Sequence, residues 1–100
     1  MNASVVVTYT IKPEALAEHL GLIADVFAEL QATNLATADY RVLRLADGVS
    51  FVHVSTSFTA DGTNPVPELG SFKAFSRDLA SRVVGPPSAS PADLIESHTP

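Results

Sequence analysis

The dipeptide Asp47-Gly48 constrains the fold of this chain most strongly, because it lies between two segments that alternate polar and apolar residues. These segments cover residues 39–46 (DYRVLRLA) and 49–58 (VSFVHVSTSF). Alternation is the side-chain period of a β-strand, and Asp-Gly is a preferred sequence for a two-residue hairpin turn. The chain is therefore predicted to contain an antiparallel hairpin that turns at Asp47 and Gly48.

The register of this hairpin divides its side chains between two faces. A two-residue turn places Leu43 opposite Val52 and Val42 opposite His53. The apolar face is predicted to pack against helices; it carries Leu43, Leu45, Val52, Val54, Thr56 and Phe58. The mixed face is predicted to be open; it carries Tyr40, Val42, Arg44, Phe51, His53, Ser55 and Ser57.

Two amphipathic helices are predicted, one on each side of the hairpin. The first covers about residues 13–31 and begins at Pro13, which suits the first turn of a helix. Its apolar stripe, at steps of three and four residues, consists of Leu16, Leu20, Ile23, Phe27 and Leu30. The second helix follows a loop at 59–67 and stops at 85–87 (GPP). Its stripe consists of Leu69, Phe72, Phe75, Leu79 and Val83, and Asp78 is predicted to pair with Arg82 one turn later.

Strands are also predicted near both ends of the chain. Residues 4–11 (SVVVTYTI) are β-branched and aromatic, whereas a short last strand is expected near 93–98, after a Ser/Pro-rich link at 88–91. The order of elements is then strand, helix, strand, strand, helix, strand. The predicted fold class is α+β: a ferredoxin-like βαββαβ sandwich in one domain (1–100), with a four-stranded antiparallel sheet and two helices on one face.

Composition excludes several classes of function. The net charge is −5, and no two of the six basic residues are adjacent, which argues against nucleic acid or an anionic membrane as a ligand. Cysteine is absent, so disulfides and Cys-based metal sites are excluded. Without a long apolar run or signal-peptide pattern, a cytoplasmic protein is expected. Only 17% of residues are charged, and together with the mixed face this favours self-association.

In this order, the elements resemble a known family. The carrying features are residues 11–14 (IKPE) after the first strand, the hairpin, residues 72–75 (FKAF) on the second helix, and residues 85–87 after it. The chain resembles the small dimeric α+β barrel proteins of the antibiotic-biosynthesis monooxygenase type. The resemblance implies a homodimer through the open sheet face and a pocket between sheet and helices. It also implies, for some members, oxidation of aromatic compounds by oxygen without a metal or flavin.

Two departures from the family pattern bear on activity. The third strand of the family carries a Glu shortly before a Trp, whereas residues 55–58 read STSF here, with Phe58 in place of the Trp. The second helix of the family opens with histidines, and Ser71 stands at one of those positions. Two functions therefore stay open. The chain is either a cofactor-independent, monooxygenase-like enzyme acting on an aromatic or polyketide-like compound, or a non-catalytic small-ligand-binding or scaffold protein with the same dimeric barrel fold.

His53 is the candidate catalytic residue. It lies in the middle of a strand on the mixed face, where a histidine can act as a general base or donate to a bound oxygen. The alternative interpretation is a structural histidine that is hydrogen-bonded across the dimer interface.

A small aromatic ligand has five further candidate contacts. Tyr9, Phe58, Phe72 and Phe75 are predicted to line an apolar pocket, with core packing as their alternative role. Arg44 is a candidate clamp for an anionic group. No metal site is predicted, because His19, His53 and His98 lie on separate elements. No cofactor is expected either.

Overall fold

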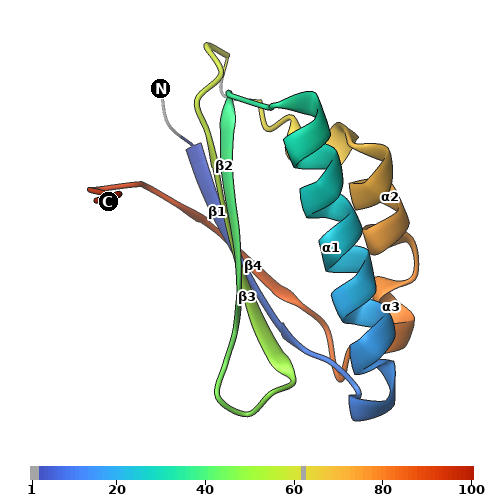
Figure 1. Ribbon diagram of the computed structural model, residues 1–100. Helices are drawn as coiled ribbons and strands as arrows, with labels where there is room; N and C mark the ends of the chain where they lie inside the picture. Colours follow the sequence, from blue (N-terminus) through green and yellow to red (C-terminus); the bar gives the residue numbers. More distant parts are fainter. Residues whose placement is uncertain (1–2, 62) are drawn as a thin grey trace.

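A computed structural model describes residues 3–61 and 63–100. A four-stranded antiparallel sheet in the order β2-β3-β1-β4 carries all the helices on one face (Figure 1). The strands are β1 (Ala3–Thr10), β2 (Ala38–Arg44), β3 (Ser50–Ser57) and β4 (Ser88–Ala92). The helices are α1 (Leu16–Thr33), α2 (Gly70–Arg77) and α3 (Leu79–Arg82), and the short 3-10 turns η1 (Pro13–Ala15) and η2 (Val66–Glu68) precede α1 and α2. This arrangement confirms the predicted ferredoxin-like α+β sandwich.

The hairpin has the predicted register, with Val42 opposite His53 and Leu43 opposite Val52. The turn is wider than a two-residue turn, because the Ser50 N–H bonds to the Asp47 carboxylate (2.8 Å) instead of continuing the ladder. Asp47 Oδ1 also accepts the N–H of Val49 at 3.0 Å. One side chain thus satisfies two backbone donors of the turn, which is a common role of Asp in loops.

The two faces of the hairpin are reversed relative to the prediction. Phe51 and His53 point toward the helices and are buried, whereas Leu43 and Leu45 on the other face are about half exposed. Burial of the polar His53 is possible because tyrosines from β1 and β2 bond to both of its ring nitrogens. The prediction was wrong because it assumed that the face with more polar side chains would be the exposed one.

The second helical segment is broken, and the last strand starts earlier than predicted. α2 ends at Arg77 and α3 begins at Leu79, with Asp78 outside helical geometry. α3 ends where Val83 forms a β-bridge with Ile11. The predicted Ser/Pro-rich link is itself β4, which covers Ser88–Ala92 instead of 93–98. Pro91 is tolerated there because β4 is an edge strand that pairs only with β1.

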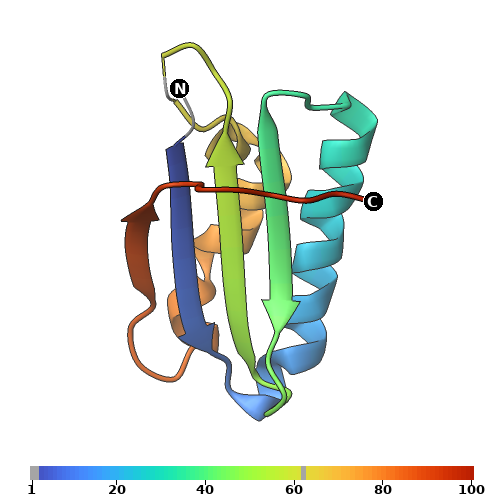
Figure 2. The same cartoon turned by 90° about the vertical axis from the view of Figure 1, so that its left-hand side faces the viewer.

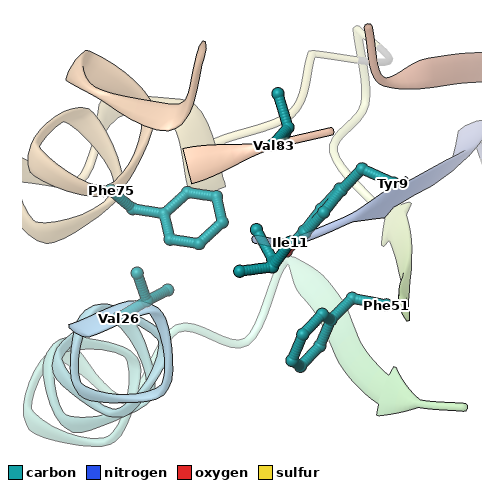
Figure 3. Packing of buried hydrophobic residues seen from close by; sticks show 6 residues of the cluster. All are labelled: Tyr9, Ile11, Val26, Phe51, Phe75 and Val83. Atoms are coloured by element: carbon teal, nitrogen blue, oxygen red, sulfur yellow. The ribbon is translucent and has the colours of Figure 1, made fainter. Parts of the chain in front are cut away.

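The core lies between the sheet and α1, α2 and the residue after α3. Its buried apolar cluster consists of Tyr9, Ile11, Val26, Phe51, Phe75 and Val83 (Figure 3). On α1 the fully buried positions are His19 and Val26, whereas Leu20 of the predicted stripe is 39% exposed. The buried side of α1 is therefore rotated toward His19. This rotation brings an unpredicted histidine beneath the sheet.

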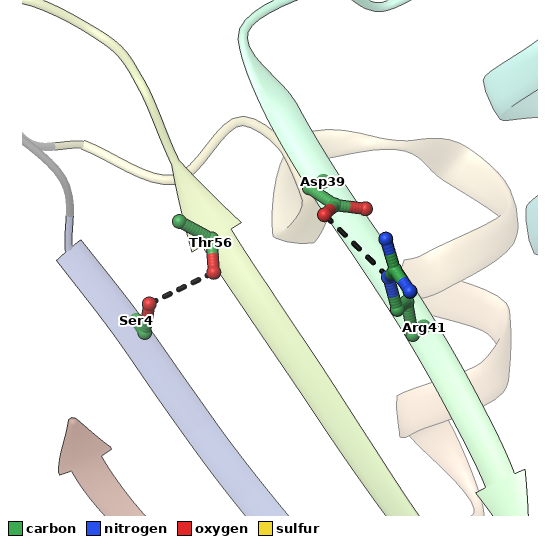
Figure 4. A network of polar contacts seen from close by, with 4 residues as sticks. All are labelled: Ser4, Asp39, Arg41 and Thr56. Atoms are coloured by element: carbon green, nitrogen blue, oxygen red, sulfur yellow. Dashed lines mark hydrogen bonds and ion pairs between the residues drawn. The ribbon is translucent and has the colours of Figure 1, made fainter. Parts of the chain in front are cut away.

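The opposite face of the sheet has no helix on it. The C-terminal segment after β4 lies on this side (Figures 1 and 2). Among its side chains, Ser4 bonds to Thr56 at 2.8 Å between β1 and β3, and Arg41 approaches Asp39 at 3.6 Å on β2 (Figure 4). We call this surface the outer face.

Candidate functional site

An apolar pocket lies between the inner face of the sheet and α2. Its volume is about 370 Å³, which is within the range of small-molecule sites. β1, β2, β3, η2, α2 and α3 all contribute to it. The lining residues are Val5, Val7, Tyr9, Tyr40, His53, Ser55, Asn64, Val66, Pro67, Phe72, Phe75, Ser76 and Leu79. No charged side chain belongs to this lining.

His53 stands at the polar wall of the pocket between two tyrosines. Its Nδ1 is hydrogen-bonded to the Tyr40 hydroxyl at 2.5 Å, and its Nε2 is hydrogen-bonded to the Tyr9 hydroxyl. The Tyr40 ring is stacked on Phe27 of α1 at 5.4 Å between centroids, which fixes the direction of its hydroxyl. Because both ring nitrogens are engaged, neither is free to contact a ligand directly.

Two further residues, His19 and Arg82, extend this cluster into the core. The Tyr9 hydroxyl is also hydrogen-bonded to His19 Nε2 at 2.7 Å. Arg82 donates from Nε to His19 Nδ1 (3.2 Å) and from Nη2 to the backbone carbonyl of Phe75 (2.6 Å). Arg82 is 2% exposed and bonds to His19 and the Phe75 carbonyl, so the predicted pair with Asp78 is wrong. Tyr40, His53, Tyr9, His19 and Arg82 therefore form one continuous chain of hydrogen bonds.

The two histidines and two tyrosines in this chain of hydrogen bonds are held neutral. Burial, with a smaller contribution from the neighbouring His19, lowers the pKa of His53 to about 4. Burial also lowers the pKa of His19 to about 4, with an added contribution from the Arg82 charge. Burial raises the pKa of Tyr9 and of Tyr40 well above its ordinary value. At neutral pH, Arg82 is the one charged residue among the five that form this chain of hydrogen bonds.

A second polar pair lies at another part of the lining. Asn64 donates from Nδ2 to Ser55 Oγ at 2.9 Å, and its Oδ1 accepts the backbone N–H of Val66 at 3.0 Å. The bond between Asn64 and Ser55 joins the segment before η2 to β3. Each of the two side-chain oxygens thus already accepts one hydrogen bond from the protein.

The structure brings together four of the predicted site residues. His53, Tyr9, Phe72 and Phe75 all line the pocket. Arg44 is exposed near the end of β2, and Phe58 is 44% exposed beyond the end of β3, so both lie outside the pocket. Tyr40 is in the lining but was predicted only as a residue of the open face. His19 and Arg82 were missed, although the seven-residue spacing of His19 and Val26 was a signal that both share a buried helical face.

The described residues hold neither a cluster of metal ligands nor a membrane-spanning helix. Across residues 3–61 and 63–100, no group of three or more His, Asp or Glu side chains converges as metal ligands do. Within the same residues, no helix has the length and apolar character needed to cross a bilayer.

Solved structures with the same fold include three informative neighbours. Rv0793 from Mycobacterium tuberculosis superposes with a TM-score of 0.79 at 11% identity, over 99% of this chain and 100% of that chain. A candidate antibiotic biosynthesis monooxygenase from Caulobacter crescentus gives 0.76 at 21% identity, over 95% and 91%. SnoaB, a cofactor-independent oxygenase from Streptomyces nogalater whose structure is that of a mutant, gives 0.69 at 15% identity, over 96% and 95%.

These likenesses concern three-dimensional structure alone. No family model and no curated protein sequence matches the chain. The chain has the fold of the antibiotic biosynthesis monooxygenase proteins, as the resemblance in its sequence implied.

Proposed function

We propose that this protein is a cofactor-independent, monooxygenase-like enzyme that acts on a small aromatic or polyketide-like compound in the pocket beneath α2. The observation that carries the proposal is the wall formed by Tyr40, His53 and Tyr9 within an otherwise apolar pocket. Aromatic rings of Phe72 and Phe75 are suited to a flat ligand, and the hydroxyl groups are suited to its oxygen atoms.

The reaction class requires an electron-rich substrate. With a quinol, one atom of oxygen enters the ring and the other leaves as water, while the quinol is converted to a hydroxyquinone. The substrate itself then supplies all the electrons, so the protein needs only to bind, orient and exchange protons. We assign the proton exchange to His53 acting through the Tyr40 hydroxyl.

The test is oxygen uptake by the purified chain with a naphthalene-type quinol, after subtraction of uncatalysed autoxidation. The hydroxyquinone is quantified as the product. The proposal predicts turnover that falls at least tenfold, the lower end of a typical general acid–base contribution, in His53→Ala and Tyr40→Phe. Arg44→Ala serves as control, because Arg44 is exposed and lies outside the pocket. No uptake above the uncatalysed rate would contradict the proposal.

A non-catalytic binding protein is the second candidate, and the state of His53 favours it. A histidine with a pKa of about 4 is a weak base, and neither of its ring nitrogens is free. This function predicts that the same quinol binds in the pocket without consumption of oxygen. Binding measured by fluorescence quenching, alongside the uptake assay, separates the two candidates.

We also propose that the protein forms a homodimer through the outer face. This face exposes apolar side chains without a covering helix, including Leu43 (51%) and Leu45 (48%). On the same side, the C-terminal segment extends away from the sheet with Ile95 85% exposed. Exposed apolar surface of this kind favours association with a complementary surface, here a second copy.

A further inference from the structure

Arg82 sets the direction of every hydrogen bond in the chain that leads to the pocket. A guanidinium can only donate, so His19 Nδ1 must accept from Arg82 Nε. The neutral His19 then carries its hydrogen on Nε2 and donates it to the Tyr9 hydroxyl oxygen. The low pKa of His19, about 4, is consistent with this neutral form.

The same logic continues from Tyr9 to Tyr40. Tyr9 already accepts from His19, and its own hydrogen finds an acceptor at His53 Nε2. His53 therefore carries its hydrogen on Nδ1 and donates it to the Tyr40 hydroxyl oxygen. In the reverse arrangement, the buried Tyr9 hydrogen has no acceptor among the described residues, which is costly in a buried site.

Tyr40 is the last residue in this chain of hydrogen bonds, and its hydroxyl hydrogen is not donated to any described residue. Within the part of the protein that the structure describes, the Tyr40 hydroxyl bonds to His53 alone. The Ser55 hydroxyl has the same hydrogen-bonding state as that of Tyr40. Its oxygen accepts from Asn64, and its hydrogen has no acceptor among the described residues. Both residues line the pocket. Tyr40 and Ser55 therefore present hydrogens to the pocket, and the oxygen of each already accepts one hydrogen bond from the protein.

The buried charge of Arg82 also favours ligands that accept hydrogen bonds in the pocket. Arg82 has no carboxylate within 4.0 Å among the described residues, and its Nη1 has no hydrogen-bond partner there. Its nearest compensation is the Phe75 carbonyl and the Phe75 ring, whose centroid is 5.4 Å from Cζ. An uncompensated buried cation polarises the hydrogen-bond chain and favours negative charge at its far end.

We infer that the pocket is a hydrogen-donor site selective for aromatic ligands whose buried end carries an acceptor oxygen without a hydrogen, either a carbonyl or an ionised phenol. Arg82 is a positioning residue for this selectivity, because it fixes the tautomers of both histidines without touching the ligand. The inference rests on the proposed function only in requiring that an aromatic compound enters the pocket.

The tautomers are measured without any ligand. Long-range proton–nitrogen NMR spectra of the full chain distinguish the two neutral forms of a histidine. The expected result at neutral pH is an Nε2–H form for His19 and an Nδ1–H form for His53, with the exposed His98 as internal reference. An Nε2–H form for His53, or a protonated ring for either buried histidine, would overturn the inference.

The ligand selectivity is measured with two compounds of nearly equal shape, β-acetylnaphthalene and β-isopropylnaphthalene. The ketone is expected to bind about fivefold more tightly, as one net hydrogen bond implies. Its carbonyl infrared band is expected to move to lower wavenumber on binding. Tyr40→Phe should abolish the larger part of this movement, and Ser55→Ala should abolish the remainder. Thr33→Ala, at the exposed end of α1, should leave it intact.

A phenol tests whether the pocket also binds an ionised phenol oxygen, the second kind of acceptor besides a carbonyl. A nitrophenol is expected to bind with the absorbance of its ionised form at a pH below its solution pKa, and to bind in its neutral form to Tyr40→Phe. If ketone and hydrocarbon bind equally without a change in the carbonyl band, the inference fails while the proposed pocket stands. If neither compound binds, the proposed function fails together with the ligand selectivity, whereas the NMR result still decides the direction of the hydrogen bonds.

Discussion

The guanidinium of Arg82 donates from Nε to Nδ1 of His19 across 3.2 Å, joining two residues that are 63 positions apart in the sequence. Both side chains are almost fully buried. The contact links α1 to α3 beneath the inner face of the sheet. It therefore couples a fixed positive charge to the polar wall of the pocket through Tyr9.

Removal of the Arg82 charge is expected to raise the pKa of His19. Burial is the larger cause of the low value of about 4, so Arg82→Met should raise the pKa without restoring the ordinary 6.5. NMR titration of the imidazole protons measures the change. Arg77→Met, which removes an exposed charge at the end of α2, is the matched control and should leave the pKa of His19 in place. An unaltered His19 titration in Arg82→Met would contradict the electrostatic role of Arg82.

Stability is expected to fall as the pH decreases from about 6.5 to about 4. His19 and His53 have folded pKa values of about 4, below their ordinary 6.5, so the unfolded chain binds more protons in this window. The contribution of the two histidines to the free energy of unfolding therefore falls with decreasing pH and levels off below their folded pKa values. A shift of this size corresponds to on the order of 3 kcal/mol for one histidine.

Urea unfolding at a series of pH values measures this dependence. His53→Asn should make the free energy of unfolding less dependent on pH between 6.5 and 4, since one of the two groups is removed. His98→Asn is the control, because His98 is exposed. A free energy of unfolding that is constant across this window would show that the buried histidines are not held neutral.

Truncation of Phe75 is expected to destabilise the protein strongly. Phe75 is 4% exposed, its ring lies against His19 and His53, and its carbonyl accepts from Arg82. Phe75→Ala should cost about 3–5 kcal/mol, the usual range for a buried phenylalanine. Phe58→Ala makes the same chemical change at a side chain that is 44% exposed and should cost much less. Chemical denaturation of both variants provides the comparison, and equal losses would contradict the observed packing.

Local sequence signals were sufficient for most of the fold. Asp47 and the alternating segments beside it determine the hairpin and its register, because both depend on residues near in sequence. The helical stripes required only a period of three to four residues. The order of these elements then restricts the topology, since two split βαβ units with right-handed crossovers form one four-stranded sheet.

Which face of the hairpin is buried was not a local property. His53 is buried because Tyr9, 44 residues away in sequence, satisfies one ring nitrogen and Tyr40 satisfies the other. No alternation pattern contains that information. The same holds for Arg82, whose helical spacing from Asp78 predicted an ion pair although its actual partners are His19 and the Phe75 carbonyl. Four lining residues of the pocket were predicted as aromatic or polar candidates, but the chain of hydrogen bonds that connects them was not.

Replacement of an outer-face residue by aspartate is expected to produce monomers that remain folded. Val54 lies in the middle of β3 between Val6 and Arg41 on the neighbouring strands, and its side chain points away from the helices. Val54→Asp would bury an unpaired charge at the proposed interface, which is strongly unfavourable. Sedimentation velocity measures the oligomeric state, and Ala24→Asp on the exposed side of α1 is the control. A wild-type chain that sediments as a monomer at micromolar concentration would refute the dimer. In contrast, Phe51→Asp should unfold the protein, since Phe51 is 1% exposed within the core.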